Sequence, residues 1–477
     1  MNKIRKKKQV IKKDKKNEFS KTDKRIVELT TLSLLNFKAF GDNQKPGSPH
    51  EEVDLQDFAP LTFIFGKNSS GKSSIIQSLN LLAQSFFRGN GIETLRGNGE
   101  LTNLGLFDAY INKHDIKKML KYSLTIKNKF VETGKTKEFG YQLAYERGEN
   151  KFAELQELFY YYDFIHNKPE PDNGLRFVYD KYKNSNQKFC RIGRPDLIDK
   201  IKTGQKLLKE IEKEYSEDKV IDIEVLKNFL EGINIATTRT GLPIALGRPM
   251  YLESKDKKQE AKIQKINNLV REIVEKKEQE FFTAIYTGMR NYLEESLSPF
   301  EILLSRYQYI GPAREAPKRT QVKKGNSFNV GVSGEQAADI LVEKKEIIDS
   351  MNEILKKLEV PYKINLRIYN DDIIETTYAI VLTDIRTNTE VSTYDVGFGI
   401  FQFIPFIVQG LYPTKNIIAC EQPEIHLHPA LIADLADFFI ETTNLEIKDR
   451  LFDLNEDLIR NDRFIFGNQW IIETHSE

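Results

Sequence analysis

The sequence predicts an α/β protein in which a mixed sheet and its helices are interrupted by a largely helical insert. An apolar strand, a glycine-rich loop and a helix follow one another over residues 61–82, and two more short apolar strands lie at 416–420 and 469–472. Between them, two segments rich in Lys, Glu and Gln, at about 197–216 and 255–296, have apolar residues at nearly heptad spacing. That spacing is typical of amphipathic helices.

The composition fits a soluble protein with a sizeable core. The chain has 477 residues, enough for two or three domains, and is 40% hydrophobic and 30% charged. No apolar run approaches the roughly 18 residues of a membrane span, and the basic N-terminus lacks the apolar stretch of a secretory signal. Two distant cysteines, Cys190 and Cys420, support neither a disulfide framework nor a zinc site. We therefore expect a cytoplasmic protein without a membrane partner.

The first 25 residues differ from the rest in charge. Residues 1–25 hold twelve Lys or Arg against three Asp or Glu, a net charge of +9 in a chain whose total is +1. A block of like charges is typical of a disordered, solvated tail. Such a block also suits DNA binding by counterion release. The sequence leaves both interpretations open.

Further elements can be predicted along the chain. Residues 26–40 are β-prone, and the aromatic run at 159–164 is interpreted as a buried strand in preference to a base-stacking surface. The two heptad-like segments form either a short antiparallel helical arm or two surface helices packed on a globular lobe. β-like patterning returns at 303–311 and 363–383, and an apolar helix follows at 403–408.

The glycine-rich loop has the pattern of a phosphate-binding loop. Residues 66–73 read Gly-Lys-Asn-Ser-Ser-Gly-Lys-Ser, between a strand and a helix. Its two glycines allow several backbone N–H groups to converge on phosphate oxygens. Lys72 would reach the β- and γ-phosphates, and the Ser73 hydroxyl would ligate Mg²⁺. The expected nucleotide-binding residues here are Gly66, Asn68, Ser69, Ser70, Gly71, Lys72, Ser73 and Ser74.

Acidic residues follow both C-terminal strands. Glu421 comes directly after the strand at 416–420, and Glu473, Thr474 and His475 follow the strand at 469–472. A phosphate-loop ATPase needs an apolar strand ending in an acid to hold Mg²⁺ through water. The segment from Glu421 therefore predicts the second half of an ATP site.

The chain resembles the ABC-type ATPases of the SMC/RecF/OLD group, where OLD stands for overcoming lysogenization defect. Within that group it is most similar to stand-alone bacterial AAA/ABC ATPases of anti-phage defence loci. Four matches occur in the expected order. They are the Asn-Phe-Lys-Ala-Phe strand motif at 36–40, the phosphate loop at 66–74, the Walker B and D-loop segment at 421–429, and the Thr-His-Ser switch motif at 474–476.

The resemblance covers roughly 27–110 and 303–477, and it implies an ABC-type P-loop NTPase fold. The expected domains are a basic disordered tail at 1–25, the N-terminal part of the ATPase domain at 26–115, an insert of short strands and then a helical arm at 116–302, and the C-terminal part of the ATPase domain at 303–477.

Two segments compete for the ABC signature motif. Ser333-Gly334-Glu335-Gln336 lies 88 residues before Glu421, whereas Gly397 lies 24 residues before it. In ABC folds the signature leads almost directly into the Walker B strand. We therefore assign Asp395–Gln402, with Gly397 and Gly399, as the signature-like segment. In this group that surface contacts ATP on the other subunit, which implies a homodimer that clamps two ATP molecules.

The resemblance also implies roles for single residues. Asn36 and Lys38 would lie beside the nucleotide, Glu421 would hold Mg²⁺ through water, and His475 would sense the γ-phosphate. Gln422 departs from the family pattern, because ABC ATPases commonly place a second carboxylate there to orient or activate water. Either hydrolysis is slow, or Glu424 substitutes, or the two roles are distributed differently. No metal other than Mg²⁺ is expected.

The expected function is a Mg²⁺-dependent, slow ATPase that dimerises around ATP and acts as a DNA-associated sensor or regulator in a defence or DNA-repair complex. The alternative is a slow nucleotide-gated scaffold that controls a partner effector without binding DNA. Complete ABC folds add a strand and helix after the switch histidine, whereas this sequence stops two residues after His475. OLD nucleases also carry a C-terminal Toprim module, and we do not expect one in this sequence. A separate effector protein, a nuclease or other, is therefore the expected partner.

Overall fold

The structure is a computed structural model that describes the residues in the following ranges: 25–41, 55–88, 91–130, 133–161, 164–165, 168–169, 174–179, 189–193, 202–214, 223–232, 235–237, 243–246, 264, 268, 279–316, 318–323, 325, 327–357, 359–369, 376–395, 398–412, 416–443 and 467–475. Most of the basic tail, Gly397 and most of 255–278 lie outside these residues, so the predictions made for them stay predictions.

Strands and helices are both abundant, which confirms the mixed α/β class. The strands are β1 (Arg25–Leu35), β2 (Leu55–Asp57), β3 (Leu61–Ile64), β4 (Thr94–Leu95), β5 (Leu120–Phe130), β6 (Thr136–Arg147), β7 (Ala153–Tyr161), β8 (Phe164–Ile165), β9 (Lys168–Pro169), β10 (Gly174–Tyr179), β11 (Phe189–Ile192), β12 (Ile235–Thr237), β13 (Pro243–Leu246), β14 (Tyr307–Ile310), β15 (Gln321–Val322), β16 (Tyr362–Tyr369), β17 (Thr377–Asp384), β18 (Thr389–Ser392), β19 (Ile417–Glu421) and β20 (Gln469–Glu473). The helices are α1 (Lys72–Arg88), η1 (Gly91–Glu93), α2 (Phe107–Tyr110), η2 (Asn112–His114), α3 (Lys202–Glu214), α4 (Ile223–Gly232), α6 (Gln279–Arg306), α7 (Ala337–Glu343), α8 (Glu346–Lys357), α9 (Phe398–Leu411) and α10 (Pro429–Thr443).

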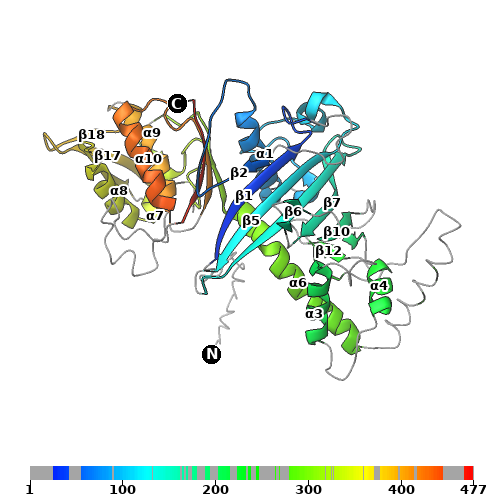
Figure 1. Ribbon diagram of the computed structural model, residues 1–477. Helices are drawn as coiled ribbons and strands as arrows, with labels where there is room; N and C mark the ends of the chain where they lie inside the picture. Colours follow the sequence, from blue (N-terminus) through cyan, green and yellow to red (C-terminus); the bar gives the residue numbers. More distant parts are fainter. Residues whose placement is uncertain are drawn as a thin grey trace, which may run out of the picture.

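A four-stranded parallel sheet lies at the centre of the molecule, with strand order β14-β19-β20-β3 (Figure 1). Trp470 of β20 pairs with Leu61 of β3, so the sheet joins segments about 400 residues apart in the sequence. Because parallel neighbours end at the same edge, the phosphate loop after β3 and the acidic ends of β19 and β20 are brought together.

The side chains of this sheet alternate between two separate hydrophobic cores. Ala419 and Ile471 face the core that contains α1, whereas Cys420 and Ile472 face the core that contains α9 and α10. In Figure 1 the sheet accordingly stands edge-on, with α1 on one side and α9 and α10 on the other. The apolar runs at 416–420 and 469–472 are continuous in sequence because both faces of these strands are covered.

A large antiparallel sheet flanks the α1 side, with strand order β13-β12-β11-β10-β7-β6-β5-β1-β2 and β4 paired to β7. The two sheets are linked by Gln469. Its side-chain oxygen accepts a hydrogen bond from the Leu29 N–H at 2.8 Å, and its Nε2 donates to the Leu29 carbonyl at 2.7 Å. Leu29 borders a register shift in the β1–β5 pairing, so the glutamine amide satisfies backbone groups of β1 across the core.

The insert is less helical than expected, because its first part is mainly strand. β5, β6 and β7 form long antiparallel pairs there, and their alternating apolar residues cover α1. The aromatic run predicted as a buried strand is the end of β7, where Phe159, Tyr160 and Tyr161 are buried. The helical expectation holds for the later part, where α3, α4 and α6 lie.

The two heptad-like helices pack on each other and on the sheets, over the residues that the structure describes. α3 contacts α6, where Gly288 allows the backbone of Ile211 to approach closely, and α6 also contacts α1, β1 and β5. Most of 255–278 lies outside the described residues, so the choice between a helical arm and helices packed on a lobe stays open. None of the helices in the described part of the chain has both the length and the apolar character needed to cross a bilayer.

A small third sheet, β15-β17-β16 with β18 on β17, packs with α7, α8 and α9 on the other side of the parallel sheet. It contains the strands expected at 363–383. The strand predicted at 303–311 is wrong in its first half, because α6 continues to Arg306 and β14 starts only at Tyr307. Leu303 and Leu304 lie in α6 and are both buried. Because this helix is buried on more than one side, its apolar residues do not show the 3.6-residue period that would have identified a helix.

Candidate functional site

The phosphate loop connects β3 to α1 as predicted. Gly66 and Gly71 have φ values of 152° and 98°, and Ser69 has a φ of 63°. These left-handed backbone positions give the loop its tight curvature, and at Gly71 a Cβ atom would also lie 3.4 Å from the Cβ of Ala39. Asn68, Ser69 and Ser70 are exposed on the loop, and Ser74 donates its N–H to the Gly71 carbonyl at 3.0 Å.

Lys72 is buried at the start of α1 and points its ammonium group back toward the loop. Its Nζ donates hydrogen bonds to the carbonyl of Gly66 at 2.6 Å and to that of Lys67 at 3.0 Å. The first turn of α1 has no acidic residue. The positive helix end and the Lys72 charge therefore make this loop a suitable place for phosphate.

The Asn36–Lys38 segment lies beside the phosphate loop. Asn36 and Lys38 have φ values of 61° and 48°, so the chain turns sharply directly after β1. The Lys38 ammonium donates to Oε1 of Gln77, on α1, at 2.5 Å. Burial lowers the pKa of Lys38, while the charge of Glu421 opposes that effect, which indicates that Lys38 and Glu421 are near neighbours.

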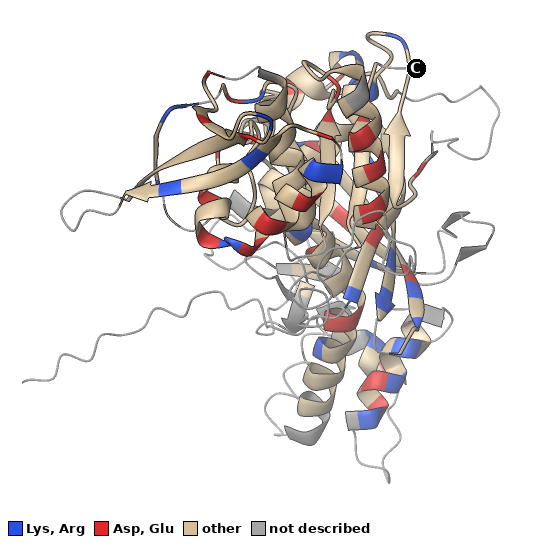
Figure 2. Cartoon of the chain, turned by 90° about the vertical axis from the view of Figure 1, so that its left-hand side faces the viewer, with Lys and Arg blue, Asp and Glu red and all other residues tan. Residues whose placement is uncertain are grey.

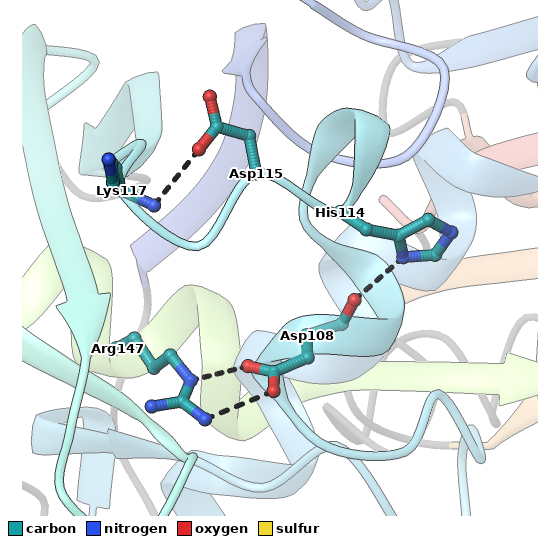
Figure 3. Close-up of polar contacts among 5 residues, drawn as sticks. All are labelled: Asp108, His114, Asp115, Lys117 and Arg147. Atoms are coloured by element: carbon teal, nitrogen blue, oxygen red, sulfur yellow. Dashed lines mark hydrogen bonds and ion pairs between the residues drawn. The ribbon is translucent and has the colours of Figure 1, made fainter.

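Asn112 and the residues around it stabilise the turn at 36–38 through hydrogen bonds. Asn112 donates its N–H to the Asn36 carbonyl at 3.0 Å and its Nδ2 to the Lys38 carbonyl at 2.6 Å. The segment that carries Asn112 is anchored by Asp108, which pairs with Arg147 through two hydrogen bonds and whose carbonyl contacts Nδ1 of His114 (Figure 3). The arginine lowers the pKa of Asp108, so the pair stays ionised.

Two carboxylates lie side by side at the ends of the parallel strands. Glu421 of β19 is the register partner of Glu473 of β20. The strand alternation directs both side chains to the α1 face, because Cys420 and Ile472, one residue earlier, face the opposite core. Glu473 accepts a hydrogen bond from the Ser73 hydroxyl at 3.0 Å, and Glu421 accepts one from the Tyr309 hydroxyl at 2.9 Å.

The environment of Glu421 disfavours its charge. Burial raises the pKa of Glu421 to about 7, and the neighbouring Glu473 carboxylate adds to the rise, while the hydrogen bond from Tyr309 and the charge of Lys38 oppose it. Burial and Glu421 in turn raise the pKa of Tyr309 well above its ordinary value, so that phenol remains a donor. A cation bound at this edge of the sheet would relieve the repulsion between the two carboxylates.

The loop after Glu421 is held from two sides. Arg314, which is buried, donates from Nη2 to the carbonyls of Glu421 and Gln422 at 2.9 and 2.8 Å, and its guanidinium lies 5.0 Å from the ring centre of Phe406. Gln422 has a φ of 49° and donates its N–H to the Glu473 carbonyl at 2.7 Å. The sharp turn after the strand is therefore tied to β20 and to the Gly-Pro-Ala-Arg loop.

Glu424 fixes the backbone that carries the predicted switch histidine. Its Oε1 accepts hydrogen bonds from the Thr474 hydroxyl at 2.7 Å and from the His475 N–H at 3.0 Å. The imidazole of His475 is exposed, as are those of His426 and His428. Glu424 thus positions His475 through Oε1, while its Oε2 is buried and has no hydrogen-bond partner among the described residues.

The signature-like helix lies next to the D-loop segment. Gly399 is in the first turn of α9, where a Cβ would lie 3.0 Å from the carbonyl of His426. Asp395 pairs with Arg319 at 3.0 Å. The competing segment, Ser333–Gln336, instead supports the loop of Arg314, because the Ser333 carbonyl accepts the Glu315 N–H at 2.8 Å.

Sequence reasoning assigned no role in this site to two residues, Glu473 and Tyr309. Glu473 follows an apolar strand just as Glu421 does, so the same signal was present in the sequence, but it became meaningful only when β20 was placed between β3 and β19. Tyr309 has no local pattern that marks it, since it acts through a partner far away in the sequence.

Residues 28–477 match the protein-family model described as AAA ATPase domain. No curated protein sequence matches the chain significantly. Among solved structures, the crystal structure of the Smc head domain with a coiled coil and joint from Pyrococcus yayanosii is similar at 14% identity, over 94% of this chain and 92% of that chain. Its TM-score is 0.33, which is too low to support an inference about fold or function.

Proposed function

The chain belongs to the family of AAA ATPase domains, and from that premise we propose that it is a Mg²⁺-dependent ABC-type ATPase of the SMC/RecF/OLD group that closes as a homodimer around ATP. One observation carries the proposal: Lys72 and Ser73 lie at the N-terminus of α1, directly beside the carboxylates that end two parallel strands. Groups suited to binding phosphate and a cation thus lie together at one edge of the sheet, which supports the proposal.

We assign separate roles in nucleotide binding and hydrolysis to the residues of the site. The loop from Gly66 to Ser74 would bind the phosphates, with Lys72 moving from the loop carbonyls to the β- and γ-phosphates. The hard oxygen ligands of Ser73 and Glu421 fit Mg²⁺, which would neutralise phosphate charge when bound. Tyr309 orients Glu421, and Glu424 holds the backbone of His475 in place to sense the γ-phosphate.

We place this ATPase in the cytoplasm as a sensor or regulator that associates with DNA within a defence or repair complex. Cys190 and Cys420 are buried and neither takes part in a disulfide, which suits a reducing compartment. DNA contact is proposed for residues 1–25. The side that carries α10 is a poor candidate, because Asp434, Asp437 and Glu441 recur along that helix (Figure 2).

A second function, a slow nucleotide-gated scaffold that controls an effector without binding DNA, has its own support. Gln422 cannot accept a proton from water, and Oε1 of Glu424 is engaged by Thr474 and His475. The glutamine at position 422 favours a long-lived ATP-bound dimer. Salt-sensitive DNA binding that disappears when residues 1–25 are deleted would favour the DNA-associated function, and its absence would favour the scaffold.

ATP turnover by the purified chain tests the proposal, measured with and without duplex DNA. Lys72→Ala should lower turnover about 100-fold or more, because it removes a charge that stabilises the transferring phosphoryl group. Lys356→Ala, which removes an exposed lysine of α8, serves as the matched control and should leave turnover unchanged. Turnover that survives Lys72→Ala would refute an ATPase at this loop. A silent wild type activated by Gln422→Glu would identify the slow scaffold.

A further inference from the structure

Glu473 is a buried carboxylate whose second oxygen has no hydrogen-bond partner in the described part of the chain. The side chain is 3% exposed, and its Oε1 accepts the hydrogen bond from Ser73 at 3.0 Å. Its Oε2 is buried and has no hydrogen-bond partner among the residues that the structure describes, and no ion pair within those residues engages it. Because burying a carboxylate without compensation costs several kcal/mol, such a group is expected where a cation will bind.

The nearby basic side chains are directed elsewhere. Lys72 donates to two loop carbonyls, and Lys38 donates to Gln77. The only hydrogen bond to the Glu473 carboxylate within the described residues is the one from Ser73, the phosphate-loop hydroxyl that ligates Mg²⁺ in this type of loop. The unpartnered oxygen therefore lies beside a predicted metal ligand.

The strand register adds a second carboxylate at the same place. Glu421 and Glu473 are direct register partners on neighbouring parallel strands, which lie about 4.8 Å apart, and both face α1. Among the described residues there is no group of three or more His, Cys, Asp or Glu that would form a complete protein cage for a metal. One hydroxyl and two carboxylates instead suit Mg²⁺, which keeps waters and shares its coordination with substrate phosphates.

We propose that Glu473 is a second carboxylate of the magnesium site, which holds the Mg²⁺ of bound ATP together with Ser73 and Glu421. This role differs from that of the acid expected at position 422, which would act on water, so Glu473 adds a cation ligand and does not replace the acid missing at Gln422. This inference rests on the proposed ATPase function and goes beyond it, because it assigns the metal site to β20 as well as to β19.

A purely structural role for Glu473, as a hydrogen-bond acceptor that fixes Ser73, is the competing explanation. Glu473→Gln separates the two, because the amide oxygen can still accept the Ser73 hydroxyl bond but carries no charge for a cation. Glu473→Asp keeps the charge on a shorter side chain. Asp339→Asn is a matched control, since it neutralises a buried acid that is hydrogen-bonded to Tyr378, outside the site.

The test measures how strongly Mg²⁺ and nucleotide assist each other's binding. The full chain is titrated with a fluorescent, non-hydrolysable ATP analogue, once with excess Mg²⁺ and once with EDTA, and the ratio of the two Kd values is compared among variants. Glu473→Gln should reduce the wild-type ratio at least about 10-fold, since removing even an outer-shell partner of a metal ligand typically costs 10- to 100-fold in metal affinity. Glu473→Asp should retain part of the ratio, and Asp339→Asn should retain all of it.

Each outcome decides a separate question. An unchanged ratio in Glu473→Gln overturns the inference while the ATPase proposal stands. Wild-type protein that binds no nucleotide under either condition refutes the ATPase proposal itself. The nucleotide affinity measured in EDTA reports whether each variant is folded. If Glu473→Gln no longer binds nucleotide in EDTA, Glu473→Asp decides the question. A purely structural role of Glu473 predicts that the ratio of Kd values for Glu473→Asp equals that of the wild type.

Discussion

Glu421 makes the stability of this protein depend on pH in a predictable direction. Burial and the adjacent Glu473 carboxylate raise the pKa of Glu421 from an ordinary 4.5 to about 7. Below pH 4.5 both the folded and the unfolded states hold the proton, and no stability is lost. Between pH 4.5 and 7 the unfolded state releases the proton first, so the free energy of unfolding falls as pH rises.

The size of the effect follows from the pKa difference. One pKa unit corresponds to about 1.4 kcal/mol, so the ionised Glu421 costs the metal-free folded protein about 3 kcal/mol above pH 7. Unfolding entropy is about 2 cal/mol/K per residue, which for a chain of this length makes 1 kcal/mol worth about 1 °C in Tm. Glu421→Gln removes the titration while keeping an oxygen that can accept the Tyr309 hydrogen bond.

We therefore expect the Tm of Glu421→Gln, relative to wild type, to rise by about 2 to 3 °C between pH 5 and pH 8 in metal-free buffer. Differential scanning calorimetry of both proteins at several pH values measures this difference. Glu353→Gln, at an exposed position on α8, should show a Tm difference that does not change with pH. A difference for Glu421→Gln that is equally constant would show that Glu421 ionises normally in the folded chain, and the reasoning would be wrong.

Three further changes test the contacts around the site. Arg314→Lys should lower the free energy of unfolding by about 2 to 3 kcal/mol in urea titrations, because an ammonium cannot reproduce the planar stacking on Phe406 together with both carbonyl bonds. Gln469→Leu should cost about 2 to 4 kcal/mol in the same measurement, since it leaves the N–H and carbonyl of Leu29 buried and unsatisfied. Thr474→Val should reduce ATP turnover about 10-fold with little change in nucleotide affinity, because it removes the hydroxyl bond through which Glu424 positions the switch segment.

The parts of the fold that could be predicted are those with a strong local pattern. The strand, loop and helix over 61–82 and the apolar strands near 417 and 470 are found where the sequence placed them. For the last two strands, continuous burial produces continuous apolar runs. The insert was predicted less well. Its short strands form one wide antiparallel sheet through pairings between distant segments, and no local period encodes such a pairing.

The site residues, like the elements of the fold, could be predicted only where a local pattern marks them. Lys72, Ser73 and Glu421 could be named because their roles depend on spacing within one segment. The contacts of Arg314 could not be predicted, since they depend on reaching two carbonyls more than 100 residues away. The signature prediction stays a prediction, because Gly397 lies outside the described residues and its expected partner belongs to another subunit.

Glu473 explains why the order of strands matters more than the order of motifs. Along the chain it is separated from Glu421 by 52 residues, and its neighbours Thr474 and His475 draw attention to a different role. In the sheet, β20 lies between β3, which leads into the phosphate loop, and β19, which ends in Glu421. Glu473, at the end of β20, is therefore one strand nearer to the phosphate loop than Glu421 is, and it contacts Ser73. A carboxylate at this position can therefore serve the phosphate loop directly, as a cation ligand from the strand next to that of Glu421.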